Sequence, residues 1–356
     1  MIKTRFYRLA IWVILMALLG GCASTSVSGL QATEIIYRDW EGVMPQSVLD
    51  DFTKETGIKV NFQPYPSPEE AVADIKSGKI CDLIVLENQL IPPLVANGTL
   101  AEPNYKNIPN FNNIAANFRD LTYDPGNRHS VPYSWGTTGL IYAGDKISQP
   151  ITRWADLWNL KPGEKIVGWN LPRYMLGMTL KSLGYSINST NPQELEHAFA
   201  KLIELKPHLV MVDWEAGVTA ANIMKDPAVV AGIAESDDVS AAKSQNVKMT
   251  YILPAEGALL WGDNYVIPSA STKKEAAEKF INFLLRADIA ARIITEDGYW
   301  LPNDAAMPLL DTSLRNNKVI FPDQKDIQNA EILLPLDDQG EKLYQDVWQR
   351  FLDAQP

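Results

Sequence analysis

The chain has 356 residues and a formal net charge of −11, from 43 acidic and 32 basic side chains. A surface this acidic argues against a nucleic-acid partner, because such partners require a basic face. The acidity is compatible with a cationic ligand, and equally with acidic groups that only keep the protein soluble. The length is ample for a large core and predicts two domains.

The first 21 residues have the pattern of a secretory signal peptide. Three basic residues precede an apolar run at 9–19, which is too short for a transmembrane helix because a span takes about 20 residues. The run is followed by Gly-Gly-Cys22, which resembles the bacterial lipobox, so we expect cleavage after residue 21 and a lipid anchor on Cys22. Residues 22–33 are small and polar, which is typical of a flexible tether.

This leader predicts where the protein works and which thiols it keeps. A lipid-anchored protein is expected on the periplasmic side of a bacterial membrane, or on the outer face of the cell membrane if the host has only one. The choice between inner and outer membrane stays open. With Cys22 acylated, Cys81 is the remaining thiol, so neither an intramolecular disulfide nor a thiolate metal cluster is expected.

Beyond the tether, strand and helix signals alternate. Short runs rich in β-branched or apolar residues indicate strands, and apolar residues at helical spacing indicate helices between them. This alternation predicts an α/β protein. The predicted strands are 34–37, 58–62 and 82–86, and the predicted helices are 45–56 (ended by Gly57), 69–77, one opened by Pro192 after an Asn191 cap, and one preceded by a capping box of Thr272 and Glu275.

No familiar catalytic signature occurs in the sequence. There is no nucleophile elbow, no P-loop, no dinucleotide-binding glycine motif and no zinc-protease motif. The three histidines, His129, His197 and His208, are scattered and are predicted to be solvated. We therefore expect no enzyme, no cofactor and no metal site.

Aromatic residues adjoin acids at predicted strand ends, where open α/β sheets bind ligands. These segments are Trp40-Glu41, Tyr133-Ser134-Trp135 and Trp261-Gly262-Asp263. An aromatic face with a carboxylate suits an ammonium group, through cation–π attraction and charge-assisted hydrogen bonds. Any one of these tryptophans could instead belong to the core. Four further tryptophans are predicted to pack in the core: Trp154, Trp158, Trp214 and Trp348.

The chain resembles the periplasmic spermidine/putrescine-binding proteins of ABC importers, in order from about Glu34 to the C-terminus. The resemblance implies a periplasmic-binding-protein fold, with two α/β lobes joined by crossover strands and the ligand held between them. It implies lobes at 34–139 plus 262–308 and at 140–261 plus 309–356. It also implies a small cationic amine as ligand, an ABC permease as partner, a monomer and no catalysis. The segments that carry the resemblance are 52–60, 130–136, 154–158, 261–263, 280–286, 298–303 and 321–323.

The resemblance also implies site residues. Trp40, Trp261, Asp263 and Tyr299 match positions that enclose and charge-pair the polyamine, and Glu41 stands where the family also lines the site. Other positions depart from the family: Val43 replaces a tyrosine, Glu87-Asn88-Gln89 replaces Ser-x-Tyr, Leu171 and Tyr174 replace an acid pair, Ala234 replaces a tryptophan, and Leu333 or Leu334 replaces a glutamine.

Loss of an acid pair is serious, because a buried ammonium without a partner costs several kcal/mol. Either other acids replace the pair or the ligand differs, and a ligand with one amino group fits the retained positions best. Candidates for charge, polar contacts or aromatic walls are Glu87, Gln89, Trp135, Trp169, Arg173, Tyr174 and Glu235.

Three alternatives remain open. The same fold could bind another small ligand, although there is no Tyr-Tyr pair for iron and only Arg173 suggests an anion. A lipoprotein enzyme would need a nucleophile and base that the sequence does not supply. An adaptor or sensor lipoprotein could have kept both lobes and lost import.

Overall fold

The computed structural model describes residues 33–65, 67–79, 81–147, 149–213, 222, 224–236, 238, 239, 248–298 and 300–355. The predicted signal peptide, Cys22, most of the predicted tether and Trp214 lie outside these residues. Residues 34–356 form one compact unit. In the described part of the chain, every helix is too short or too polar to cross a membrane.

A mixed sheet of ten strands organises this unit, with the central order β2-β1-β3-β9-β4-β7-β5-β6. The outer pairs are parallel, whereas β9 runs antiparallel to both β3 and β4. β10 adds to β9, and β8 adds to β4. The strands are β1 (Glu34–Arg38), β2 (Lys59–Phe62), β3 (Leu83–Glu87), β4 (Ser130–Tyr142), β5 (Lys165–Trp169), β6 (Leu209–Val212), β7 (Val229–Glu235), β8 (Thr250–Ile252), β9 (Leu259–Val266) and β10 (Glu331–Ile332).

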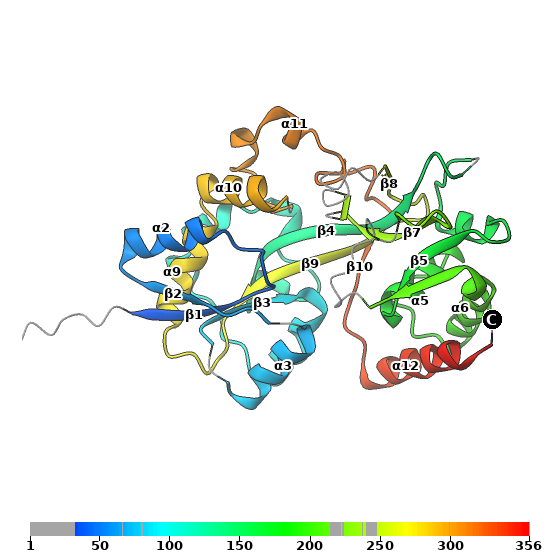
Figure 1. Ribbon diagram of the computed structural model, residues 1–356. Helices are drawn as coiled ribbons and strands as arrows, with labels where there is room; N and C mark the ends of the chain where they lie inside the picture. The colour runs from blue at the N-terminus through cyan, green and yellow to red at the C-terminus, as the bar shows by residue number, and fades with distance from the viewer. Residues whose placement is uncertain are drawn as a thin grey trace, which may run out of the picture. The chain divides into compact units, whose positions relative to one another are not determined.

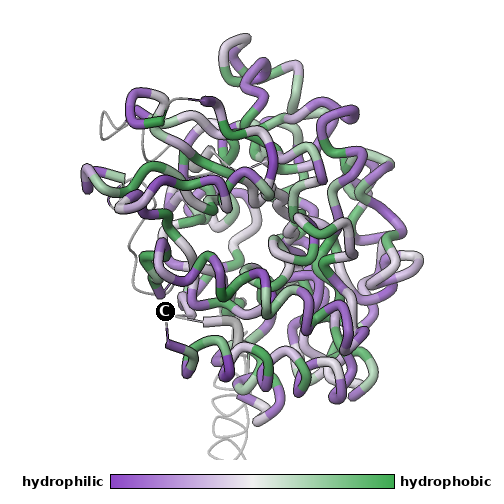
Figure 2. The backbone as a smooth tube through the Cα atoms, turned by 90° about the vertical axis from the view of Figure 1, so that its right-hand side faces the viewer, coloured by the Kyte–Doolittle hydropathy of each residue, from purple (hydrophilic) through white to green (hydrophobic). Residues whose placement is uncertain are grey.

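The helices flank the sheet and place one apolar face against it. In Figure 2 the helical turns alternate between hydrophobic and hydrophilic colours, as expected for helices with one buried side. The helices are α2 (Gln46–Thr56), α3 (Pro68–Ser77), α4 (Ile91–Ala96), α5 (Pro172–Ser182), α6 (Pro192–Leu205), α9 (Lys274–Leu284), α10 (Ala287–Asp297), α11 (Thr312–Arg315) and α12 (Asp338–Asp353).

Most local sequence signals are confirmed. Gly57 ends α2 in the left-handed conformation, at φ +73°, where its N–H donates to the Thr53 carbonyl. Asn191 caps α6, because its side-chain oxygen accepts from the Gln193 N–H at 2.9 Å. The capping box at Thr272 was wrong: α9 begins one residue later, with Lys273 as N-cap and no side-chain cap.

The buried apolar residues form two hydrophobic clusters. The first draws on residues 35–135 and 265–321, and the second on residues 140–259 and 333–351. β4 and β9 contribute to both, and Figure 1 shows them side by side as they pass from one group of elements to the other. The predicted lobe boundaries stay a prediction. Trp154, Trp158 and Trp348 pack with the second cluster, as expected.

Candidate functional site

Three neighbouring strands bring polar side chains into one row. Glu87 at the end of β3 lies opposite Asp263 of β9, and Ser134 of β4 lies opposite Asp263 on its other side. Residues directly opposite one another in a sheet share a face, and alternate residues of one strand do so too. Trp261, two residues before Asp263, therefore belongs to the same face of the sheet.

Asp263 is buried, with 8% of its surface exposed, and its charge is only partly compensated. Its Oδ2 accepts from the Ser134 hydroxyl at 3.0 Å, while its Oδ1 has no hydrogen-bond partner among the described residues. Burial, followed by the charges of Glu87 and Asp39, holds the pKa of Asp263 well above its usual value, against the Ser134 hydrogen bond. A cation placed here would relieve both the burial cost and the repulsion.

Asp39 is an acid that the sequence analysis overlooked. It is fully buried just after β1 and accepts from the Trp40 N–H at 2.8 Å and from the Tyr37 hydroxyl. The sequence carried a usable signal, because Asp39 directly precedes the predicted Trp40 at a strand end. We call Asp39, Glu87 and Asp263 the acidic group.

Aromatic rings border the acidic group. The half-buried Trp40 meets Tyr65 edge to face, with ring centroids 4.9 Å apart, and the Tyr65 hydroxyl donates to the Val85 carbonyl at 3.0 Å. Burial first, then the charges of the acidic group, raise the pKa of Tyr65, which places this ring within electrostatic reach of all three acids. Tyr65 was also missed by the sequence analysis.

A second set of residues approaches the acidic group from α5, β5 and β7. Tyr174 meets Trp169 edge to face, with centroids 5.3 Å apart. Burial, followed by the charges of Glu87, Glu235 and Asp263, raises the pKa of Tyr174. Glu235 is itself 9% exposed. The charges of Glu87 and Glu235, which come from β3 and β7, therefore both act on Tyr174. Their role as ligand contacts stays a prediction.

A family model for bacterial extracellular solute-binding proteins matches residues 47–318. The chain belongs to this family. This membership confirms the predicted fold class and the predicted type of protein, and the family consists of transporter binding proteins rather than enzymes.

Relatives of this solute-binding protein cover almost all of the compact unit. The spermidine/putrescine-binding periplasmic protein of Escherichia coli K12 is 32% identical over 320 residues, covering 88% of this chain and 91% of that protein. A spermidine/putrescine ABC transporter substrate-binding protein from Streptococcus pneumoniae is 30% identical, with a TM-score of 0.81, covering 90% of this chain and 98% of that one. A lipoprotein of Treponema pallidum shares the fold at 21% identity, with a TM-score of 0.77 and coverage of 89% and 99%.

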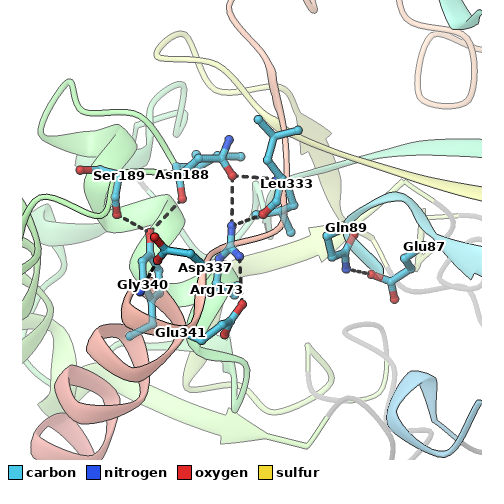
Figure 3. Close-up of polar contacts among 12 residues, drawn as sticks. Glu87, Gln89, Arg173, Asn188, Ser189, Leu333, Asp337, Gly340 and Glu341 are labelled. Carbon is cyan, nitrogen blue, oxygen red and sulfur yellow. Dashed lines mark hydrogen bonds and ion pairs between the residues drawn. The ribbon is translucent and has the colours of Figure 1, made fainter. Parts of the chain in front are cut away.

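Arg173 of the solute-binding protein is bonded away from the acidic group. Its guanidinium donates to the Asn188 side chain and to the Leu334 carbonyl, both at 3.0 Å, and lies 3.8 Å from a Glu341 carboxylate oxygen. Figure 3 shows this network beside α12, with the Glu87 and Gln89 side chains bonded to each other some way off. The arrangement favours a structural role for Arg173 over contact with a ligand.

Among the remaining predicted residues, Trp135 is not brought to the acidic group. Trp135 lies opposite Gly262, on the other face of the sheet from Asp263, and packs against Phe118 with centroids 5.1 Å apart. Strand alternation explains this, because Trp135 immediately follows Ser134. Glu41 is exposed. Tyr299 lies outside the described residues.

Two cavities described in the structure lie elsewhere. One, of about 470 Å³, is lined by the chain from Tyr251 to Ala255 together with Lys318 and Lys325, and the other, of about 10 Å³, holds one water at most. Contacts and charge therefore define the candidate site. Among the described residues, no three His, Cys, Asp or Glu side chains are placed to hold a metal ion.

Proposed function

We propose that this protein is the substrate-binding component of an ABC importer and that it captures a polyamine or related small amine at the acidic group. The observation that carries the proposal is Asp263, which is buried beside Glu87 with one carboxylate oxygen unpartnered among the described residues. A bound ammonium would supply the missing charge and hydrogen bond. The printed names of the relatives, which bind spermidine and putrescine, support the same chemistry.

The arrangement of the acids bears on the number of amino groups in the ligand. The sequence alone favoured one amino group, because the second acid pair is replaced by Leu171 and Tyr174. The charges of Glu87 and Asp263 raise the pKa of both Tyr65 and Tyr174, whereas Asp39 acts on Tyr65 and Glu235 acts on Tyr174. Carboxylates flanked by aromatic rings on both sides support a ligand with at least two amino groups.

The partner and the location are part of the same proposal. A binding protein of this family delivers its ligand to a membrane permease, and an acyl anchor on Cys22 would keep it on the periplasmic side of a bacterial membrane. We propose that the protein acts there as a monomer. The net negative charge of the chain, −11, agrees with capture of a cation because it favours the approach of a positively charged ligand.

Calorimetry on the purified protein tests the ligand class. The panel is putrescine, cadaverine, spermidine, several monoamines and neutral amino acids. We expect micromolar binding of at least one di- or polyamine, and weaker binding of the matched monoamine. Binding of none of the amines at millimolar concentration would overturn the proposal and leave the adaptor or sensor lipoprotein as the better account.

A further inference from the structure

Two glycines and two tryptophans form reciprocal pairs where β4 and β9 run together. Gly136 lies opposite Trp261, and one residue further along, Trp135 lies opposite Gly262. The two pairs occupy opposite faces of the sheet, because neighbouring residues of a strand alternate. Each tryptophan therefore faces a position on the partner strand that has no side chain.

Each indole lies directly over its glycine. A Cβ atom added to Gly136 would lie 2.0 Å from Cζ2 of Trp261 and within 2.7 Å of two further atoms of that six-membered ring. A Cβ added to Gly262 would lie 2.7 Å from Trp135. Real Cβ contacts start at 3.0 Å, so alanine at position 136 would force the Trp261 ring to move by about 1 Å or more.

We propose that Gly136 is a positioning residue of the amine site: because it lacks a side chain, the Trp261 indole can lie flat across β4 and form a wall beside Asp263. The inference rests on the proposed function. Trp261 is 7% exposed and shares its face of the sheet with Asp263 and Ser134. The glycine thereby sets the distance between an aromatic face and the carboxylate that binds the ammonium.

This distance matters because both attractions act on the same cation. A cation–π contact needs the charge within about 6 Å of the ring centroid, and a hydrogen bond to Asp263 needs about 3 Å between heavy atoms. Binding sites generally tolerate displacements of only about 0.5 Å. A Trp261 ring displaced from Gly136 would either lose contact with the bound ammonium or occupy the position that the ammonium needs.

The alternative is that Gly136 serves only strand packing. Gly262 is the matched control, because alanine there also clashes with a tryptophan of the same strand pair, though less closely, and moves Trp135, which packs with Phe118 on the opposite face. A purely structural effect would lower stability in both variants and change ligand affinity in neither.

The experiment measures amine affinity by calorimetry and thermal unfolding for wild type, Gly136→Ala, Gly262→Ala, Trp261→Ala and the double variant Gly136→Ala/Trp261→Ala, using the amine that wild type binds best. We expect Gly136→Ala to raise the Kd about tenfold or more. Gly262→Ala should leave the Kd within about twofold of wild type. The double variant should match Trp261→Ala within about twofold, because without the indole nothing remains to be positioned.

Wild-type affinity in Gly136→Ala, or an equal loss in Gly262→Ala, would overturn the inference. If Gly136→Ala does not fold, the double variant decides, since it lacks the clashing ring: a Kd well above that of Trp261→Ala would contradict the proposal. Failure of wild type to bind any amine would instead refute the proposed function.

Discussion

Replacing Asp263 with asparagine should weaken amine binding and at the same time stabilise the unliganded protein. Asparagine keeps the shape and can still accept from the Ser134 hydroxyl, which lies 3.0 Å from Oδ2. It removes the negative charge that would bind the ammonium. A hydrogen bond to a charged group is worth about 1.5 to 3 kcal/mol, so the Kd should rise about 10- to 150-fold.

The stability gain follows from the raised pKa of Asp263. Between its usual pKa of 3.8 and the raised value, the folded protein holds a proton that the unfolded chain has released. The stability of the unliganded protein therefore falls as pH rises through this window. Asp263→Asn removes the penalty, because a neutral amide is not repelled by Glu87. Its melting temperature without ligand should exceed that of wild type at neutral pH.

The same pKa predicts pH-dependent binding. Protons compete with the amine for Asp263, so wild-type affinity should weaken as pH falls through the raised pKa, and Asp263→Asn should lose this dependence. Ser134→Ala is the control: it removes a hydrogen bond that lowers the pKa of Asp263, so the midpoint should move to higher pH. Calorimetry and thermal unfolding across pH make the test. An unchanged Kd in Asp263→Asn, or a lower melting temperature without ligand, would refute the reasoning.

Three further outcomes are expected. Arg173→Met should lower the free energy of unfolding by about 1 to 3 kcal/mol, because the half-buried Leu334 carbonyl loses its donor, while the Kd stays unchanged; a large loss of affinity would restore Arg173 as a ligand contact. Glu278→Gln should lower the free energy of unfolding in urea by about 1.5 to 3 kcal/mol. The Glu278 carboxylate is 1% exposed and accepts from the Asn104 backbone N–H and the Asn107 side-chain amide, each at 2.7 Å. An unchanged free energy of unfolding would contradict this role. Cys81 is buried, and burial raises its pKa to about 12. A thiol reagent at pH 8 should therefore react with the mature protein only after unfolding, and should then label one thiol per chain. A second labelled thiol would show that Cys22 is not acylated.

Local signals in the sequence predicted much of the fold. Gly57 and the Asn191 cap mark real helix boundaries, because a left-handed turn and a side-chain cap act within a few residues. The predicted capping box at Thr272 was wrong. The Ser271 hydroxyl oxygen accepts from the Lys273 N–H at 3.1 Å, and α9 begins at Lys274, with Lys273 as its N-cap. Such competition among neighbouring polar groups is settled by the packing around them.

Within the site, the sequence by itself placed the aromatic Trp261 and the acidic Asp263 together at the end of a predicted strand. The structure shows that both lie inside β9, where residues two apart point the same way. Only the tertiary structure decided that β3 and β4 flank β9, which places Glu87 and Ser134 against Asp263 and turns Trp135 to the far face. Strand neighbours and register depend on how apolar faces far apart in the chain are buried together, and no local pattern records that choice.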